Sequence, residues 1–125
     1  MPKRTPTDTE LQVLSVLWDQ GPATARKVLE RMPDGKKRSY TTVLAIMQVM
    51  EKKGLLSRRL EGRAHVYRPV QGRDRLMKPV LRTLVKRVFK GRPTAVVQQL
   101  LRDQSPSKQE IAEIRALLDE LDGQA

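Results

Sequence analysis

The sequence predicts a mostly α-helical chain with one small β-hairpin, divided into an N-terminal and a C-terminal domain. Apolar residues recur at helical spacing in several stretches of the 125-residue chain. The pattern becomes strand-like only in residues 55–60 and 64–70, which flank the turn sequence EGR and therefore predict a hairpin. The order is three helices, the hairpin and then further helices. We expect the domains to span residues 1–71 and 72–125.

The first expected helix begins at a capping box, because Thr7 is followed three residues later by Glu10. Gly21 and Pro22 end this helix, and a second helix is expected over residues 24–32. The apolar face of the first helix is expected to contain Leu11, Val13, Leu14, Leu17 and Trp18. The place of Trp18 on this apolar face favours a core role over a recognition role.

A third helix is expected over residues 39–53, ended by Gly54. At 100° per residue its buried stripe consists of Val43, Ile46, Met47 and Met50. Its opposite side carries Thr41, Ala45, Gln48 and Lys52. The first half of this helix has no charge, although basic residues crowd both of its flanks.

The chain is predicted to be helical again from Gly72, with three helices separated near Gly91 and at a second capping box, Ser107 to Glu110. A module of about 50 residues without disulfides or metal seldom stabilises itself alone, so we expect two copies to pair and form a homodimer. The apolar residues expected in this interface are Leu81, Leu84, Val88, Val97, Leu101, Ile111, Ile114, Leu118 and Leu121.

The charge of the chain is strongly uneven. The net charge is +11, and residues 24–68 hold twelve Lys and Arg against four Asp and Glu, whereas residues 103–125 have a net charge of −4. This asymmetry indicates a polyanionic partner. Binding to an anionic membrane would need a basic amphipathic helix with bulky apolar anchors, so nucleic acid is favoured. Aromatic residues make up only 3% of the chain, which argues against a base-stacking platform.

The chain lacks the residues that several classes of enzyme and metal-binding protein need. The chain has no Cys, and His65 is its single histidine, more typical of a surface or packing residue than of a catalytic base. No glycine-rich phosphate loop and no set of metal ligands is present, so we expect no catalytic residue, cofactor or metal. There is no membrane-spanning run and no signal-peptide core, so we expect a cytoplasmic protein without direct membrane binding.

Three helices followed by a basic hairpin are typical of a winged helix-turn-helix, in which residues 39–53 would enter the major groove of double-stranded DNA. Hydroxyl, amide and small methyl groups suit base edges, so the candidate base contacts are Thr41, Thr42, Ala45 and Gln48. The candidate phosphate contacts are Lys36, Lys37, Arg38, Ser39, Tyr40, Lys52, Arg58, Arg59 and Arg63. For Ser39, a plain helix-capping role remains open, and Arg68 is also expected to lie near phosphates.

The segments ELQVLSVLW, SYTTV, MEKKGLLSR, EGRAHVYRP and SKQEIAEIRALLDEL, in this order, resemble the penicillinase-repressor family of bacterial transcription regulators, the BlaI/MecI type. The resemblance implies a winged-helix domain, a helical dimerisation domain and repression at inverted-repeat operators. It also implies a membrane-sensor protease as a partner, which triggers cleavage in the C-terminal domain. The cut bond, typically Asn–Phe in the family, corresponds to Gln99–Leu100 here, and the recognition helix departs from the family at Thr41, Leu44 and Ala45.

The sequence therefore predicts a homodimeric, sequence-specific transcriptional repressor on a palindromic operator, not an enzyme. Two other classes remain open. A sequence-neutral, nucleoid-type DNA-binding protein would use the same charge without a preferred site. A protein-interaction module would bind no duplex at all.

Overall fold

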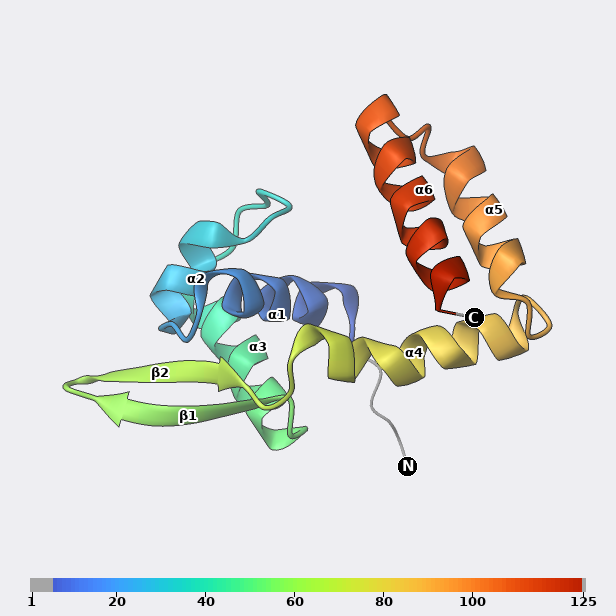
Figure 1. Ribbon diagram of the computed structural model, residues 1–125. Coiled ribbons are helices and arrows are strands. Elements are labelled where there is room, and N and C mark those ends of the chain that lie inside the picture. Colours follow the sequence, from blue (N-terminus) through green and yellow to red (C-terminus); the bar gives the residue numbers. More distant parts are fainter. Residues whose placement is uncertain (1–5, 125) are drawn as a thin grey trace. The chain divides into compact units, whose positions relative to one another are not determined.

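The computed structural model describes residues 6–124, which divide into two compact units, one up to Val80 and one from Leu81 onward. The first unit contains α1 (Asp8–Gln20), α2 (Ala25–Arg31), α3 (Tyr40–Lys52), β1 (Leu56–Glu61) and β2 (Ala64–Pro69), as Figure 1 shows. The remaining helices are α4 (Arg73–Arg87), α5 (Pro93–Asp103) and α6 (Lys108–Gly123). The expected helical fold with a small hairpin is confirmed. The compact units divide inside α4, whereas the domain boundary between residues 71 and 72 stays a prediction.

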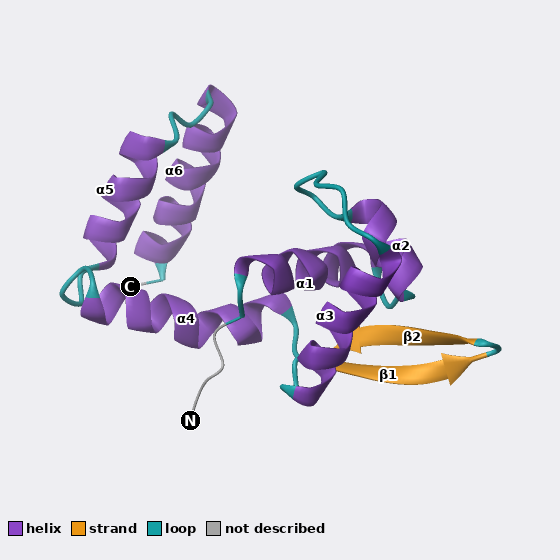
Figure 2. Cartoon of the chain, turned by 180° about the vertical axis from the view of Figure 1, so that it is seen from behind, coloured by secondary structure: helices purple, strands orange, loops and turns teal. Residues whose placement is uncertain are grey.

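The strands β1 and β2 form an antiparallel hairpin that projects away from α1, α2 and α3 (Figure 2). Its register pairs Leu56 with Pro69 at the base and Glu61 with Ala64 at the tip. Gly62 turns the tip with φ of 65°, a conformation that glycine adopts without steric cost. At the base, the backbone of Tyr67 exchanges two hydrogen bonds with Ala23, at 3.0 and 2.8 Å. This bridge ties the hairpin to the segment between α1 and α2.

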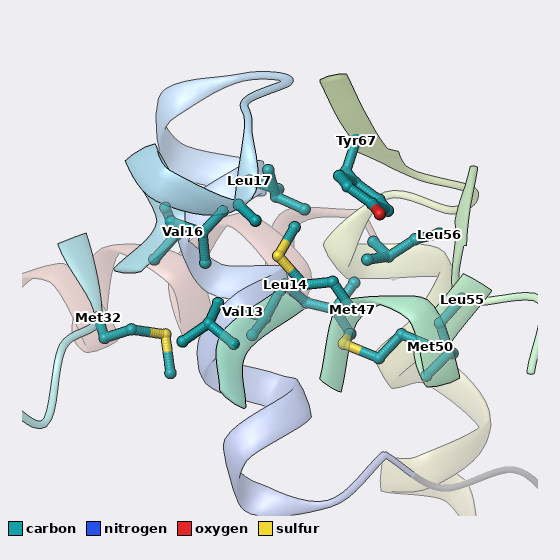
Figure 3. Close-up of a cluster of buried hydrophobic side chains, with 13 residues drawn as sticks. Val13, Leu14, Val16, Leu17, Met32, Met47, Met50, Leu55, Leu56 and Tyr67 are labelled. Carbon is teal, nitrogen blue, oxygen red and sulfur yellow. The ribbon is translucent and has the colours of Figure 1, made fainter. Parts of the chain in front are cut away.

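The core of the first unit forms where the three helices meet the base of the hairpin (Figure 3). It contains thirteen buried apolar residues: Val13, Leu14, Val16, Leu17, Ala25, Val28, Met32, Val43, Met47, Met50, Leu55, Leu56 and Tyr67. Complete burial of one such large side chain contributes about 1.5–3 kcal/mol. Because α3 contributes three of these residues, its orientation is fixed by packing rather than by helix propensity.

The helix boundaries differ from the expected ones by one residue, because Thr24, Ser39 and Lys53 cap their helices instead of lying inside them. The expected buried face of α1 was partly wrong. Leu11 and Trp18 are only half-buried, and Val16 is buried instead. The indole N–H of Trp18 donates to the Gln71 carbonyl at 3.0 Å, so the ring lies at the edge of the core.

The second unit, from Leu81 onward, differs from the first in how little of it is buried. Both the capping box at Ser107 and the helix breaks near Gly91 appear as expected. None of the residues from 81 to 124 is buried. Pro79 lies inside α4, two residues before this unit begins, and removes one backbone hydrogen bond of the helix. Most of the large apolar side chains of this unit are exposed, while Val85, Phe89, Val96 and Ile114 are half-buried.

Candidate nucleic-acid interface

The start of α3 is fixed by its own hydroxyl groups. Ser39 caps the helix, since its Oγ accepts from the Thr42 backbone N–H at 3.1 Å. The hydroxyls of Ser39 and Thr42 also lie 2.9 Å apart and form a hydrogen bond. The capping role considered for Ser39 is thus present, and the Thr42 hydroxyl already has one partner. Each hydroxyl keeps part of its donor and acceptor capacity for a further partner.

The opposite side of α3 is exposed and uncharged over most of its length. Because α3 buries Val43, Met47 and Met50, the residues at spacings of four, three and four on the other side point to solvent. These residues are Thr41, Ala45, Gln48 and Lys52, all exposed. The structure therefore brings three of the four candidate base contacts onto one face, with Thr42 beside them.

The basic loop before α3 is braced by a carboxylate. Both terminal guanidinium nitrogens of Arg38 donate to Asp34, at 2.8 and 2.7 Å. Asp34 also accepts from the Gln12 side chain and from the Lys36 backbone N–H, at 3.1 and 3.0 Å. The Arg38 hydrogen bonds hold the pKa of Asp34 well below its usual range, and Asp34 raises the pKa of Arg38 in return. Asp34 thus joins the loop to Gln12 of α1 and holds Arg38 in place, while Lys36 and Lys37 are exposed beside it.

A second brace joins α1 to the end of α3. Lys53 donates to Glu10 at 2.8 Å, and Glu10 is only 4% exposed. Burial raises the pKa of Glu10, but hydrogen bonds from Lys53 and from the Thr7 backbone outweigh it and lower that pKa overall. Beside this pair lies a hollow of about 380 Å³, lined by Thr7, Thr9, Glu10, Ala45, Ile46 and Val49.

The arginines of the hairpin do not form one set, because successive residues of a strand point to opposite faces. Arg58 lies opposite Tyr67, on the face that carries the core residues, and pairs with Glu51 of α3 at 3.4 Å. Arg59 belongs to the other face, with Arg68, whose guanidinium lies 3.6 Å from Glu61. Arg63 is exposed at the hairpin tip. From the sequence, the same phosphate-contacting role is expected for these four arginines. The two-residue period of a strand, however, already places Arg58 and Arg59 on opposite faces.

A groove lies between α2, the start of α3 and the hairpin tip, with a volume of about 310 Å³. In it the Arg26 guanidinium carbon lies over the Tyr40 ring, 4.8 Å from its centre. The residues lining the groove are Thr24, Ala25, Arg26, Tyr40, Leu44, Arg63, Ala64, His65 and Tyr67. The sequence did not single out Arg26, since its approach to Tyr40 depends on how α2 crosses α3. His65, assigned to surface or packing, is exposed at this groove.

The residues expected in the dimer interface lie on the three C-terminal helices. Eight of the nine are exposed, and Ile114 is half-buried. They are Leu81, Leu84 and Val88 near the second half of α4, Val97 and Leu101 on α5, and Ile111, Ile114, Leu118 and Leu121 on α6. Gln99 and Leu100 lie inside α5, and Leu100 is 57% exposed.

Within residues 6–124, no group of three or more His, Cys, Asp or Glu side chains is placed to hold a metal ion. No helix in this part of the chain is both long and apolar enough to cross a membrane.

The model of the penicillinase repressor family matches residues 6–120. The chain belongs to the penicillinase repressor family. The family resemblance of the sequence segments is thereby confirmed, and the match extends over both compact units.

Individual relatives agree with this membership. The transcriptional regulator BlaI of Mycobacterium tuberculosis is 39% identical over 71 residues, which cover 56% of this chain and 51% of that protein. The chain thus matches about half the length of this curated relative. The penicillinase repressor of Bacillus licheniformis is 25% identical over 114 residues, covering 91% of this chain and 89% of that protein. Among solved structures, a transcriptional regulator from Thermotoga maritima shares the fold with a TM-score of 0.53 and 18% identity, covering 94% of this chain and 74% of that chain.

Proposed function

We propose that this chain is a sequence-specific DNA-binding repressor of transcription that acts as a homodimer on a palindromic operator. The observation that carries the proposal is the exposed, uncharged face of α3, which is flanked by the cationic loop and the cationic hairpin. Phosphate contacts position a protein on the duplex, whereas uncharged polar and methyl groups distinguish bases. Membership of a repressor family supports the same function.

Within this function, Thr41, Ala45 and Gln48 would contact base edges, with Thr42 beside them. The exposed cations Lys36, Lys37, Lys52, Arg59 and Arg63 would contact phosphates. Arg38 and Arg58 each have a carboxylate partner, so a phosphate contact by either would compete with Asp34 or Glu51. Their contribution would then come partly through holding the loop and the hairpin in place.

The proposed homodimer would form through the C-terminal domain, residues 72–125, leaving residues 1–71 to bind one half-site each. The exposed apolar stripes of α4, α5 and α6 support this assignment, because large apolar surfaces without a cover mark association sites. A repressor of this kind would work in the cytoplasm, where operator DNA is accessible to it.

Proteolytic relief of repression would require cleavage at Gln99–Leu100, the bond implied by the family resemblance. This bond lies in the middle of α5, and cleavage acts on transiently opened segments. Induction by a membrane-sensor protease would therefore need local unwinding of α5 first.

The test is a set of mobility-shift titrations on the preferred duplex and on an unrelated duplex of equal length. Gln48→Ala should relax base preference, at a cost of roughly 1–3 kcal/mol on the preferred site. Arg59→Ala should weaken both complexes similarly and reduce the salt slope by about 1. An affinity of the wild-type chain that does not change with salt would contradict the proposal, because phosphate contacts release counterions.

A further inference from the structure

The groove at the start of α3 gathers positive charge from two separate elements. Arg26 reaches it from α2 and Arg63 from the hairpin, and the imidazole of His65 also lines it. No Asp or Glu is among the residues that line it. A concave site with cationic groups and no carboxylate concentrates anions. The groove is therefore chemically suited to an anionic ligand.

Arg26 and Tyr40 form an ordered pair at this groove. The guanidinium carbon lies 4.8 Å from the centre of the ring, and Tyr40 is 39% exposed. A guanidinium over an aromatic face is attracted by the ring, and its N–H groups remain donors in a fixed fork. Because the ring already restrains this long side chain, less rotamer entropy is lost when it binds an oxygen anion.

The charge of Arg26 is not neutralised by a neighbour. Four other arginines of the first unit do lie within 4.0 Å of a carboxylate: Arg38, Arg58, Arg68 and Arg73. Among the described residues, neither Arg26 nor Arg63 has such a partner. A new anion can thus bind Arg26 without displacing an existing salt bridge.

We propose that this groove binds one backbone phosphate of DNA, with Arg26 as its main donor and Tyr40 as the residue that positions Arg26. The inference rests on the proposed function and adds a contact to it. Tyr40 directly precedes Thr41, the first candidate base contact, so a phosphate held here fixes the position of α3 along the duplex. Such a contact strengthens binding to every sequence alike, because the backbone carries no base code. A free phosphorylated compound presents the same oxygens, and the experiment separates the two sources.

The experiment uses the full-length chain and titrates its preferred duplex and a random duplex at several salt concentrations. Arg26→Ala should weaken both complexes roughly fivefold and reduce the salt slope by about 1. Arg26→Lys should retain the slope, because it keeps the charge, but recover only part of the affinity. Arg31→Ala is the matched control, since Arg31 is an exposed arginine five residues along the same helix and should behave like the wild type.

Tyr40 provides a second, independent readout. Tyr40→Ala should weaken both complexes, whereas Tyr40→Phe, which keeps the ring over Arg26, should weaken them less. The double variant Tyr40→Ala with Arg26→Ala should lose no more DNA affinity than Arg26→Ala alone, because the ring acts through the guanidinium. Fully additive losses would show that Tyr40 does not position Arg26.

An unchanged salt slope in Arg26→Ala, or a loss confined to the preferred duplex, would overturn the phosphate contact while the wild-type preference still stands. A wild-type chain that binds no duplex would overturn both this inference and the proposed function. Inorganic phosphate is then titrated into the free chain and followed by NMR at the Arg26 Nε resonance. Saturable shifts together with normal DNA binding of Arg26→Ala would assign the groove to a free phosphorylated ligand instead of DNA.

Discussion

In the unit up to Val80, thirteen apolar side chains are buried in one cluster, whereas in the unit from Leu81 to residue 124 no residue is buried. The first unit joins three helices and a hairpin around this cluster. The second unit presents apolar stripes on its helices without covering them, with Leu118 59% exposed as one example. From this difference we infer that the first unit can fold by itself, whereas the second needs a partner surface.

This difference also explains where function can reside. A self-sufficient core holds α3 rigidly, and its exposed face can then recognise a duplex with a defined geometry. The open apolar stripes of the second unit are instead suited to pairing with an identical stripe in a two-fold dimer. Four changes test this division, from the largest expected effect to the smallest.

Leu14→Ala removes a side chain that is 1% exposed in the centre of the first unit. We expect a loss of about 3 kcal/mol in the free energy of unfolding, from lost burial and the cavity left behind. Trp18 is the single tryptophan and lies in this unit, so urea unfolding followed by its fluorescence reports the loss. A change below about 1 kcal/mol would contradict a tightly packed core.

Leu118→Asp places a charge in the proposed dimer interface. We expect sedimentation to show monomers and the affinity for a palindromic duplex to fall about 100-fold, because the second half-site is no longer bound intramolecularly. The urea unfolding of the first unit, followed by Trp18 fluorescence, should stay unchanged. Val70→Asp is the matched control, since Val70 is a similarly exposed apolar residue of the first unit. Dimers that persist in Leu118→Asp would place the interface elsewhere.

Asp34→Asn tests the brace that holds the loop before α3. The Arg38 hydrogen bonds lower the pKa of Asp34 in the folded chain, so on acidification the unfolded chain takes up this proton first. The stability that the ionised Asp34 contributes is complete above the ordinary aspartate pKa, near 4, and is lost as pH falls below it. We expect the wild type to lose more stability between pH 7 and pH 3 than Asp34→Asn does. If the wild type, Asp34→Asn and the control Asp74→Asn all lost the same stability over this pH range, the hydrogen bonds between Arg38 and Asp34 would not be formed in solution.

Tyr67→Phe is expected to have the smallest effect. The Tyr67 hydroxyl is buried and, within the described part of the chain, has no hydrogen-bond partner. Removal of an unsatisfied buried hydroxyl should leave the free energy of unfolding unchanged or raise it by about 1 kcal/mol. A clear loss of stability, measured by the same urea titrations, would show that the hydroxyl has a partner in solution.

The sequence predicted those features that depend on local signals. The two capping boxes, most of the buried stripe of α3 and the hairpin turn at Gly62 each involve residues a few positions apart, and the structure confirms them. In the stripe of α3, Val43, Met47 and Met50 are buried as expected, whereas Ile46 is only half-buried. The family resemblance was also confirmed. The proposed DNA contacts of individual side chains remain predictions.

Pairing between distant segments could not be predicted in the same way. Gln12 contacts Asp34 across 22 residues, and Arg26 meets Tyr40 only because α2 packs against α3. Trp18 packs against the core as expected but is only half-buried, because its position on α1 faces the segment after the hairpin, where Gln71 accepts its N–H. Helical periodicity gives the face of a helix, but not the element that lies against it.

Selection of bound fragments from random DNA by the intact chain tests the central claim most directly. We expect enrichment of an inverted repeat whose half-site centres lie about 10–10.5 bp apart, or a multiple of that spacing. Two half-sites would reflect two self-sufficient first units joined by their second units. An unenriched pool, or a single half-site without a repeat, would contradict this account.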